Sequence, residues 1–578
     1  MTADNRHSAT VSQPMVSSAV FLLTCDMALH DEEPLVARLA VWLAAQGVQC
    51  HESVITTRDG VVAGYGCVAT RKLKKGELLF RVPRKACFGP RAGAPIDAEA
   101  PGDTQRRFAV RLLKERALGS ASRWHPLLAV LSPAPCPWIW PEGSERFLDG
   151  TELEEVLARK RQRLRCERKK IGLSDDAARS REYDAACALV ASHLNPWFGG
   201  SITPVNATLN YAAAPNVEFE AEGVDTVVAR AVRPIAAGEE LTQEYCESTA
   251  MFLYRYGFVP SAVLGTDGPN ADGAGPTAGA VRPLADDAVS ISSAALLALV
   301  APPSRHPLLA PRLRLLCAAG ALGVCPWDGL DELVTAEIQR DGVGTAKLVG
   351  ALLLLALDDE RWALAEAAAA AAAAASAEAA PEMAAKADGS DDDDADDDDD
   401  DDAIAAALVA AAFGVGSQEA QALEQLAGSE GGEDGDPWPA LLAQAAALAP
   451  VGRRAQIEES ITNAIERARH AVRQRHSRLE AATVAPPEER SDGYAASGDA
   501  QYGAGRAGKR TAKRARLSAE AGSAEHRPSV PAAETAAISL AGAWRLAQGL
   551  RRVEQAILED ALRLLEAASA EKLAVKLG

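Results

Sequence analysis

Two glycines stand one residue apart near the start of the chain, at positions where the backbone could lie against a bound molecule. Gly64 and Gly66 flank Tyr65. Because glycine lacks a Cβ, a ligand can approach the backbone closely at these positions. A tight hairpin turn that binds nothing would use the same residues. The glycine pair alone leaves both interpretations open, and the choice depends on the rest of the chain.

A second segment, far along the sequence, carries polar and aromatic residues that could act together with this turn. Asn210 lies in an apolar, glycine-poor stretch, where a buried amide needs hydrogen-bond partners. Tyr245 and Tyr256 follow it and are two of only eight tyrosines in the chain. Aromatic rings also pack into protein cores without a catalytic role, so these residues are compatible with an active site and with plain core packing.

The composition limits the kind of protein that can carry these segments. With 578 residues the chain exceeds the size of one compact core, which predicts two or three folded units. Aspartates fill positions 391–394 and 396–402, and this run supplies more than half of the net charge of −20. An acidic chain is a poor candidate for general nucleic-acid binding, so we expect no nucleic-acid partner.

Cysteine usage and hydropathy argue against two further classes of protein. The ten cysteines include no Cys-x-x-Cys pair, which argues against a zinc cluster and a disulfide framework and favours a reducing compartment. The apolar stretch Val349 to Leu357 is far shorter than the roughly 20 residues of a membrane-spanning helix. We therefore expect neither a metal site nor a membrane partner.

In the first half of the chain, the elements that must position the two segments alternate between helix and strand. A helix should follow Pro34 and stop at Gly47, whereas Val54 to Val82 contains short β-type runs separated by glycines. The remaining elements are predicted in this order: helices at 105–118, 152–170 and 182–194, β-type runs at 217–220 and 226–232, and a helix near 248–256.

The second half is predicted to be helical, with long interruptions. Leucine-rich stripes at 290–358 are typical of core-facing helices. The alanine-rich and aspartate-rich tract at 366–435 shows no face that would be buried, and we expect it to be largely disordered. Helix is expected again at 438–480 and disorder at 484–530. Apolar residues from Leu546 to Leu564 step by three and four, which predicts a last helix packed most simply on the region 290–358.

Both segments, together with motifs between them, resemble the SET domain, and specifically its Rubisco-methyltransferase-like class. The matching motifs are, in chain order, Ala63–Ala69, Lys75–Pro83, Ser122–Leu127, Trp140 with Leu148–Thr151, Asn210–Val217, Ile235–Leu241, Glu244-Tyr245 and Tyr254–Val259. The resemblance covers about 36–260 and extends weakly over 285–360 and 530–570. Within the class, the chain looks most like the nuclear non-histone and ribosomal-protein lysine methyltransferases.

The resemblance implies an α+β fold. A β-rich SET core with a helical insertion is followed by an all-α C-terminal substrate-binding domain with disordered insertions. The predicted organisation begins with a disordered leader at 1–33, a SET domain at 34–260 with its helical insertion at about 105–195, and a linker at 261–285. The helical C-terminal domain follows in two segments, 286–365 and 437–482, which are separated by an Ala/Asp-rich low-complexity insertion at 366–436. A disordered basic segment at 483–530 comes next, and a C-terminal helix within 531–578 packs on the helical domain.

The resemblance also implies a function, the transfer of a methyl group from S-adenosylmethionine to a lysine of a histone, ribosomal or other protein substrate. Tyr245 matches the catalytic tyrosine. The residues that match the cofactor site are Ala63, Gly64, Tyr65, Gly66, Asn210, Tyr211 and Tyr245. Tyr256 and Phe258 match the channel that admits the target lysine, and no metal is implied.

Three single positions depart from the pattern of the class, and a helix end that often contains an arginine in the class reads Ala-Ser-His-Leu at 191–194 here. The histidine of its Asn-His pair is Tyr211 here, the aspartate three residues before the asparagine is Ala207, and the glycine after the catalytic tyrosine is Cys246. These departures keep a second hypothesis open, in which a catalytically weakened SET fold serves as a scaffold or binding protein in the nucleus.

A basic cluster within 506–516 bears on localisation. Its Lys-Arg-x-x-Lys-Arg-x-Arg pattern, from Lys509 to Arg516, resembles a nuclear localisation signal, although basic linkers also contain such clusters. We expect a nuclear protein, with the cytoplasm as a further location and the chloroplast as the alternative if the N-terminal leader is a transit peptide. We expect the chain to act as a monomer on a protein substrate.

Overall fold

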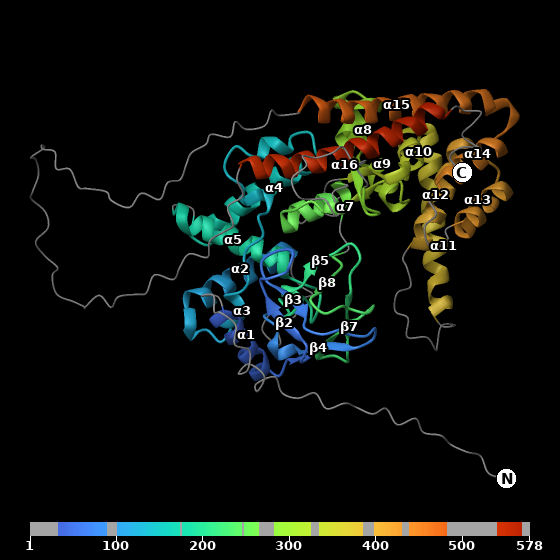
Figure 1. Ribbon diagram of the computed structural model, residues 1–578. Helices are drawn as coiled ribbons and strands as arrows, with labels where there is room; N and C mark the ends of the chain where they lie inside the picture. The colour runs from blue at the N-terminus through green and yellow to red at the C-terminus, as the bar shows by residue number, and fades with distance from the viewer. Residues whose placement is uncertain are drawn as a thin grey trace, which may run out of the picture.

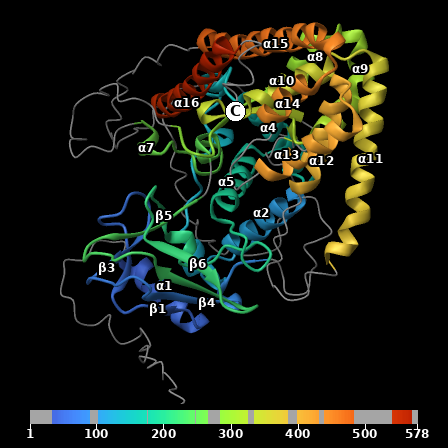
Figure 2. The ribbon, with the colours of Figure 1, turned by 90° about the vertical axis from the view of Figure 1, so that its right-hand side faces the viewer.

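The computed structural model describes residues 33–89, 101–173, 176–245, 248–264, 283–324, 334–384, 398–430, 438–482 and 540–568. Several sequence-based expectations fall outside these ranges. They concern the leader up to residue 32, Cys246, most of the linker, the basic cluster at 506–516 and most of the aspartate run. In the described parts, the strands of the first half lie at one end of the molecule and the C-terminal helices at the other (Figures 1 and 2).

Two small sheets form the β-rich part of the first half. The strands are β1 (Gln49–Cys50), β2 (Val54–Thr57), β3 (Gly66–Ala69), β4 (Leu78–Pro83), β5 (Asn210–Tyr211), β6 (Val217–Ala221), β7 (Thr226–Ala231) and β8 (Glu240–Gln243). One sheet has the order β1-β4-β7-β6 and the other the order β2-β3-β8-β5. Strand β4 therefore pairs with β7, although about 140 residues of sequence lie between them.

Strand β8 brings the two chemical segments together. It pairs antiparallel with β3, where Cys67 faces Leu241, and parallel with β5, where Asn210 faces Thr242. The glycine-rich turn runs directly into β3, so it lies at one side of β8 while Asn210 lies at the other. The two segments that the sequence analysis singled out thus share one sheet.

The first helix of this part of the chain precedes β1, and those that follow form the insertion between β4 and β5. The helices are α1 (Glu33–Gln46), α2 (Pro101–Ala117), α3 (His125–Leu128), α4 (Leu153–Lys170) and α5 (Ala177–His193). Helix α1 ends at Gly47, whose φ of +83° lies in the left-handed region that glycine adopts at low cost. Helices α2 and α5 pack against each other in the same core as the sheets, with Phe108, Leu112 and Leu189 buried.

The C-terminal region is predominantly helical. Its elements are α8 (Ser293–Val300), α9 (His306–Ala318), α10 (Thr345–Leu355), α11 (Asp359–Ala384), α12 (Asp398–Phe413), α13 (Ser417–Glu430), α14 (Trp438–Leu448), α15 (Arg454–Ala481) and α16 (Leu540–Ala567), preceded by the short α7 (Ser261–Leu264). It also contains an antiparallel sheet of β10 (Gly323–Val324), β11 (Val334–Gln339) and β9 (Ala288–Ser292), in that order. The sequence analysis did not predict this sheet.

The expectation of a largely disordered tract at 366–435 is wrong for its described residues. Helices α11, α12 and α13 occupy much of this tract and belong to the second hydrophobic core. Ala369 is buried in that core with Leu408, Phe413 and Leu423. Alanine favours helix intrinsically, and here the neighbouring helices bury one face, which an isolated polyalanine helix lacks.

Helix α16 joins the two cores. Its predicted apolar stripe is buried, with Leu550 in the core of the first half and Val553 and Ile557 in that of the C-terminal region. It runs along α15 and also contacts β9 and β11 (Figure 1). The predicted partner, the region 290–358, therefore supplies part of its contacts, while α15 and the core of the first half supply others.

Candidate active site

One carboxylate holds the two chemical segments together. The side-chain amide of Asn210 donates to the carbonyl of Ala63 at 2.9 Å and to Glu240 Oε1 at 2.7 Å. The backbone N–H of Val62 donates to Glu240 Oε2 at 2.8 Å. Glu240 at the start of β8 therefore binds both the glycine-rich turn and the Asn210 amide. Sequence reasoning did not single out Glu240, although it lies within a quoted motif.

The turn itself needs both of its glycines. Gly64 has a φ of +53°, which side-chain-bearing residues rarely adopt. A Cβ at Gly66 would lie 2.6 Å from Glu240 Oε1 and 2.6 Å from Val61 Cγ1, so only glycine fits there. Tyr65 between them is buried and lies under the guanidinium of Arg58, which is 4.4 Å from the ring centroid. The tyrosine anchors the turn while the backbone at 63 and 64 stays exposed.

Five aromatic side chains lie together beside this turn, and we call them the ring cluster: Tyr211, Tyr245, Phe252, Tyr256 and Phe258. The ring centroids of Tyr245 and Tyr256 are 4.5 Å apart, and those of Tyr211 and Phe252 are 4.6 Å apart. The structure thus brings together Tyr245, Tyr256 and Phe258, as the resemblance implied. It adds Tyr211, which was matched to the cofactor site, and Phe252, which was missed. A spacing of four between Phe252 and Tyr256 was the available signal, because residues so spaced share a helix face.

A short π-helix and a glycine set the direction of two of these rings. Residues Phe252–Tyr256 form one π-helical turn, a geometry often found at functional sites. Gly257 follows with a φ of +73°, and a Cβ there would lie 2.5 Å from the carbonyl oxygen of Pro135. The chain therefore turns tightly between Tyr256 and Phe258, which places both rings in the cluster.

Tyr245 connects the ring cluster to the segment that carries Asn210. Its hydroxyl donates to the carbonyl of Leu209 at 3.1 Å. Burial raises the pKa of Tyr245 above its ordinary value, and the neighbouring Tyr256 and Glu240 raise the pKa further. The phenol therefore stays protonated near neutral pH and offers a neutral hydroxyl for hydrogen bonding.

Amide side chains brace the chain on both sides of Asn210. Asn206 donates to Gln243 Oε1 at 2.8 Å, and Gln243 donates back to the carbonyl of Asn206 at 3.0 Å. On the other side, the buried Asn216 donates to the carbonyl of Glu240 at 2.8 Å and accepts from Thr242 N–H at 2.8 Å. Between them, Ala207 is half-buried and donates its N–H to the carbonyl of Thr203. Cys246 lies outside the described residues.

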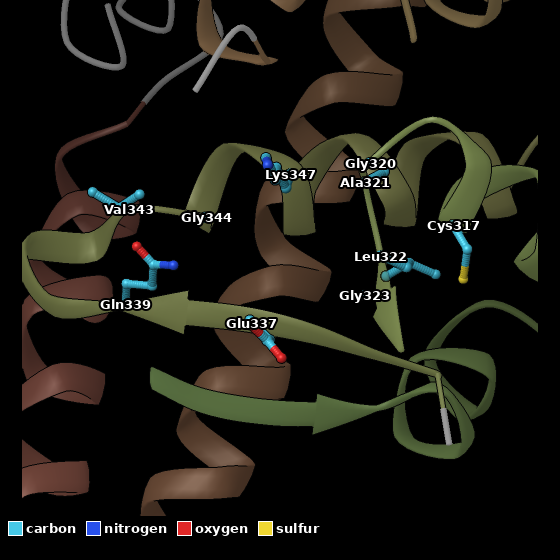
Figure 3. A pocket seen from close by; sticks show the side chains of 10 residues that line it. All are labelled: Cys317, Gly320, Ala321, Leu322, Gly323, Glu337, Gln339, Val343, Gly344 and Lys347. Atoms are coloured by element: carbon cyan, nitrogen blue, oxygen red, sulfur yellow. The ribbon is translucent and has the colours of Figure 1, made fainter. Parts of the chain in front are cut away.

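A cavity of about 350 Å³ lies elsewhere, in the C-terminal region (Figure 3). It is lined by Cys317, Gly320, Ala321, Leu322, Gly323, Glu337, Gln339, Val343, Gly344 and Lys347. None of these residues belongs to the ring cluster or the glycine-rich turn. We therefore place the site at the turn and the ring cluster, where the motif residues converge.

The described residues were also compared with the requirements of a metal site and of a membrane-spanning helix. Within these ranges, no group of three or more His, Cys, Asp or Glu side chains could hold a metal ion. No described helix is both long and apolar enough to cross a membrane.

Strands β3 to β8 and Tyr245 lie within one stretch of the chain, residues 64–246. Residues 64–246 match the model of the SET domain, so the chain carries a SET domain. The match and the described elements confirm the predicted β-rich SET core with a helical insertion. The C-terminal region was predicted to be all-α; it is mostly helical and also contains the sheet of β9, β10 and β11.

Among curated proteins, the chain is similar to the N-lysine methyltransferases SETD6 of several vertebrates. It is 28% identical over 286 residues to SETD6 of Rattus norvegicus, which covers 41% of this chain and 56% of that protein. It is 29% identical over 250 residues to SETD6 of Homo sapiens, covering 37% and 52%. The chain thus spans about half the length of these relatives. Among solved structures, that of Rubisco LSMT bound to AdoMet aligns with a TM-score of 0.48 and 15% identity, covering 93% of each chain.

Proposed function

We propose that this protein is an S-adenosylmethionine-dependent protein-lysine N-methyltransferase. The observation that carries the proposal is the convergence of the glycine-rich turn, Asn210 and the ring cluster around Tyr245. The SET domain match and the similarity to proteins named N-lysine methyltransferase support the same reaction.

The residues of the turn suit a small, polar cosubstrate. The backbone at Ala63 and Gly64 is exposed, and the carboxylate of Glu240 lies directly behind it. The space beside Gly66 is too narrow for any side chain, so the chain passes close to its neighbours there. S-adenosylmethionine would supply an electrophilic methyl group at this position. The turn and Asn210 would hold the cosubstrate with its methyl group toward Tyr245.

The ring cluster addresses the main difficulty of the reaction, which is that lysine is protonated at neutral pH. With an ordinary pKa near 10.4, deprotonation at neutral pH costs roughly 4 kcal/mol. Aromatic walls desolvate the ammonium group and so favour the neutral amine. The hydroxyl of Tyr245 would then orient the amine lone pair toward the methyl group. Alignment and electrostatics would supply most of the acceleration, with no covalent intermediate on the protein.

A second candidate function is a nuclear scaffold built on a SET fold with weakened catalysis. Tyr211 and Ala207 favour it, because both replace residues that the class uses beside the cofactor. The two functions differ in whether S-adenosylmethionine is consumed.

The test is methyl transfer by the full chain. The protein is incubated with S-adenosylmethionine carrying a radiolabelled methyl group and with a nuclear extract, and the labelled amino acid is identified after hydrolysis. We expect label in Nε-methylated lysine of a protein, and only a trace of label when the Tyr245→Phe variant is used. Unlabelled extract, together with protein that binds no S-adenosylmethionine at millimolar concentration, would favour the scaffold.

We further propose that the protein is nuclear and acts as a monomer on its protein substrate. The nuclear location is supported by the basic cluster at 506–516 alone. A fluorescent fusion should accumulate in the nucleus, and neutral substitution of Lys509, Arg510, Lys513 and Arg514 should release it into the cytoplasm. Accumulation in chloroplasts would support the transit-peptide alternative instead.

A further inference from the structure

Asn210 and Tyr211 are neighbours on strand β5, but their side chains serve different parts of the site. Successive side chains of a strand point to opposite faces. Asn210 points to the turn and binds Ala63 and Glu240, whereas the Tyr211 ring lies among the rings of the cluster. The Tyr211 side chain, which stands where the class has histidine, therefore faces away from the partners of Asn210.

The surroundings of Tyr211 are aromatic. Its ring centroid is 4.6 Å from that of Phe252, 5.6 Å from that of Tyr245 and 6.1 Å from that of Phe258. Phe252 is only 1% exposed and fills the interior of the cluster. The other rings keep part of their surface exposed. Tyr211, Tyr245, Tyr256 and Phe258 thus pack around the buried Phe252 and are themselves only partly buried.

We propose that the Tyr211 side chain is a wall of the site that receives the target amine and does not contact the cosubstrate. The inference rests on the proposed function, and it moves Tyr211 from the cofactor residues to the acceptor residues. An additional ring extends the apolar wall that desolvates the lysine head group and favours its neutral form, and it limits the directions from which the amine can approach. Tyr211 is then a positioning residue for the acceptor.

The experiment measures acceptor and cosubstrate binding separately by isothermal titration calorimetry with the full chain. The probes are S-adenosylhomocysteine, and then Nα-acetyl-lysine methylamide and its Nε-monomethyl form added to the complex. Tyr211→Leu should weaken binding of both amine probes by at least about fivefold, while the Kd of S-adenosylhomocysteine stays within about twofold. Tyr211→Phe, which keeps the ring, should retain both affinities. Phe219→Leu on β6 is the matched control, because it removes a half-buried ring of the same domain outside the cluster.

A loss of S-adenosylhomocysteine affinity in Tyr211→Leu with unchanged amine binding would overturn the inference and leave the proposed function standing. Absence of S-adenosylhomocysteine binding by the wild-type protein would overturn the proposed function, and the inference with it. Tyrosine-ring ¹³C NMR of the wild-type complex covers the case in which Tyr211→Leu does not fold. The amine probe should shift the Tyr211 resonance, assigned by its absence in Tyr211→Phe. A probe that shifts Tyr245 but leaves Tyr211 unmoved would contradict the assignment.

Discussion

At the scale of single residues, the proposed chemistry depends on a hydroxyl that stays protonated. The Tyr245 hydroxyl donates to the carbonyl of Leu209, and burial keeps its pKa above the ordinary value. Tyr245→Phe removes only this oxygen and keeps the ring in contact with Tyr256. We expect turnover to fall by roughly a hundredfold, the usual loss when one oriented hydrogen bond is removed from an active site. Calorimetry should show unchanged affinity for S-adenosylmethionine, and unchanged turnover would remove Tyr245 from catalysis.

A second prediction at this scale concerns Glu240. Its two oxygens accept from Asn210 and from the N–H of Val62, so Glu240→Gln removes the charge and one acceptor. Hydrogen bonds to a charged group contribute about 1.5–3 kcal/mol, so the affinity for S-adenosylmethionine should fall roughly tenfold or more. Glu218→Gln on β6 is the control, because that carboxylate is exposed and lies on the other sheet. Equal affinities in the two variants would show that the turn does not need Glu240.

Sequence reasoning found the residues of this site better than their directions. The motif positions Tyr245, Tyr256 and Phe258 do meet in the ring cluster. Tyr211 was matched to the cosubstrate site, and its ring lies in the ring cluster. A motif gives position but does not show which face of a two-residue strand a side chain occupies. Phe252 was missed because an apolar residue in a predicted helix looks the same whether it fills a core or lines a site.

At the scale of elements, the π-helical turn and Gly257 are what aim Tyr256 and Phe258. Gly257→Ala adds a methyl group 2.5 Å from the carbonyl oxygen of Pro135, in addition to the unfavourable positive φ. The control is Gly76→Ala, where φ is +81° but no atom lies within 4 Å of the added Cβ. The control should lose about 1 kcal/mol of the free energy of unfolding, and Gly257→Ala about 1–3 kcal/mol more. Equal losses in thermal or denaturant unfolding would show that the turn tolerates the methyl group.

Local pattern predicted most elements of the SET domain but failed where burial comes from distant partners. Helix α1, the strands around Gly66 and the last helix follow their apolar periodicity. In the tract at 366–435, Leu408 and Phe413 are buried among alanines, and its helices also pack on α9 and α14, which lie outside the tract. A composition cannot show which neighbours will cover it.

At the scale of the whole molecule, a buried arginine of α16 fastens the C-terminal region to the SET domain. Arg551 is 1% exposed and donates to the carbonyls of Phe147, Asp149 and Leu479 at 2.7–3.0 Å. Arg551→Leu leaves these carbonyls without the donor, and we expect a loss of about 3 kcal/mol or more of the free energy of unfolding. The adjacent, exposed Arg552→Leu should change it by less than about 0.5 kcal/mol. Thermal unfolding of the two variants measures the difference, and equal Tm values would contradict this role of Arg551.

The same junction should make stability depend on pH. Glu152 accepts from Ser290, and its backbone N–H donates to Glu554 of α16, which pairs with Arg475 of α15 at 2.8 Å. Desolvation raises the pKa of Glu152 to about 8, and the nearby Glu554 contributes further. Glu337 on β11 also raises the pKa of Glu152, while Arg475 lowers it.

The folded protein therefore keeps a proton on Glu152 that the unfolded chain releases once the pH rises above the ordinary glutamate pKa of 4.5. The stabilisation from the protonated Glu152 is complete below pH 4.5 and is lost as the pH rises through about 8. We expect the Tm of the wild-type protein to fall across this range. Glu152→Gln, which mimics the protonated form, should lose that part of the pH dependence, whereas Glu155→Gln on the exposed face of α4 should keep it. Parallel Tm profiles of wild type and Glu152→Gln would contradict this assignment.

The central claim is that the glycine-rich turn, Asn210 and Glu240 form a site for S-adenosylmethionine. The measurement that tests it most directly is isothermal titration of S-adenosylmethionine into the full chain, with no acceptor required. We expect saturable binding of one molecule per chain, retained in Tyr245→Phe and weakened in Glu240→Gln. No detectable heat of binding at millimolar S-adenosylmethionine would contradict the account.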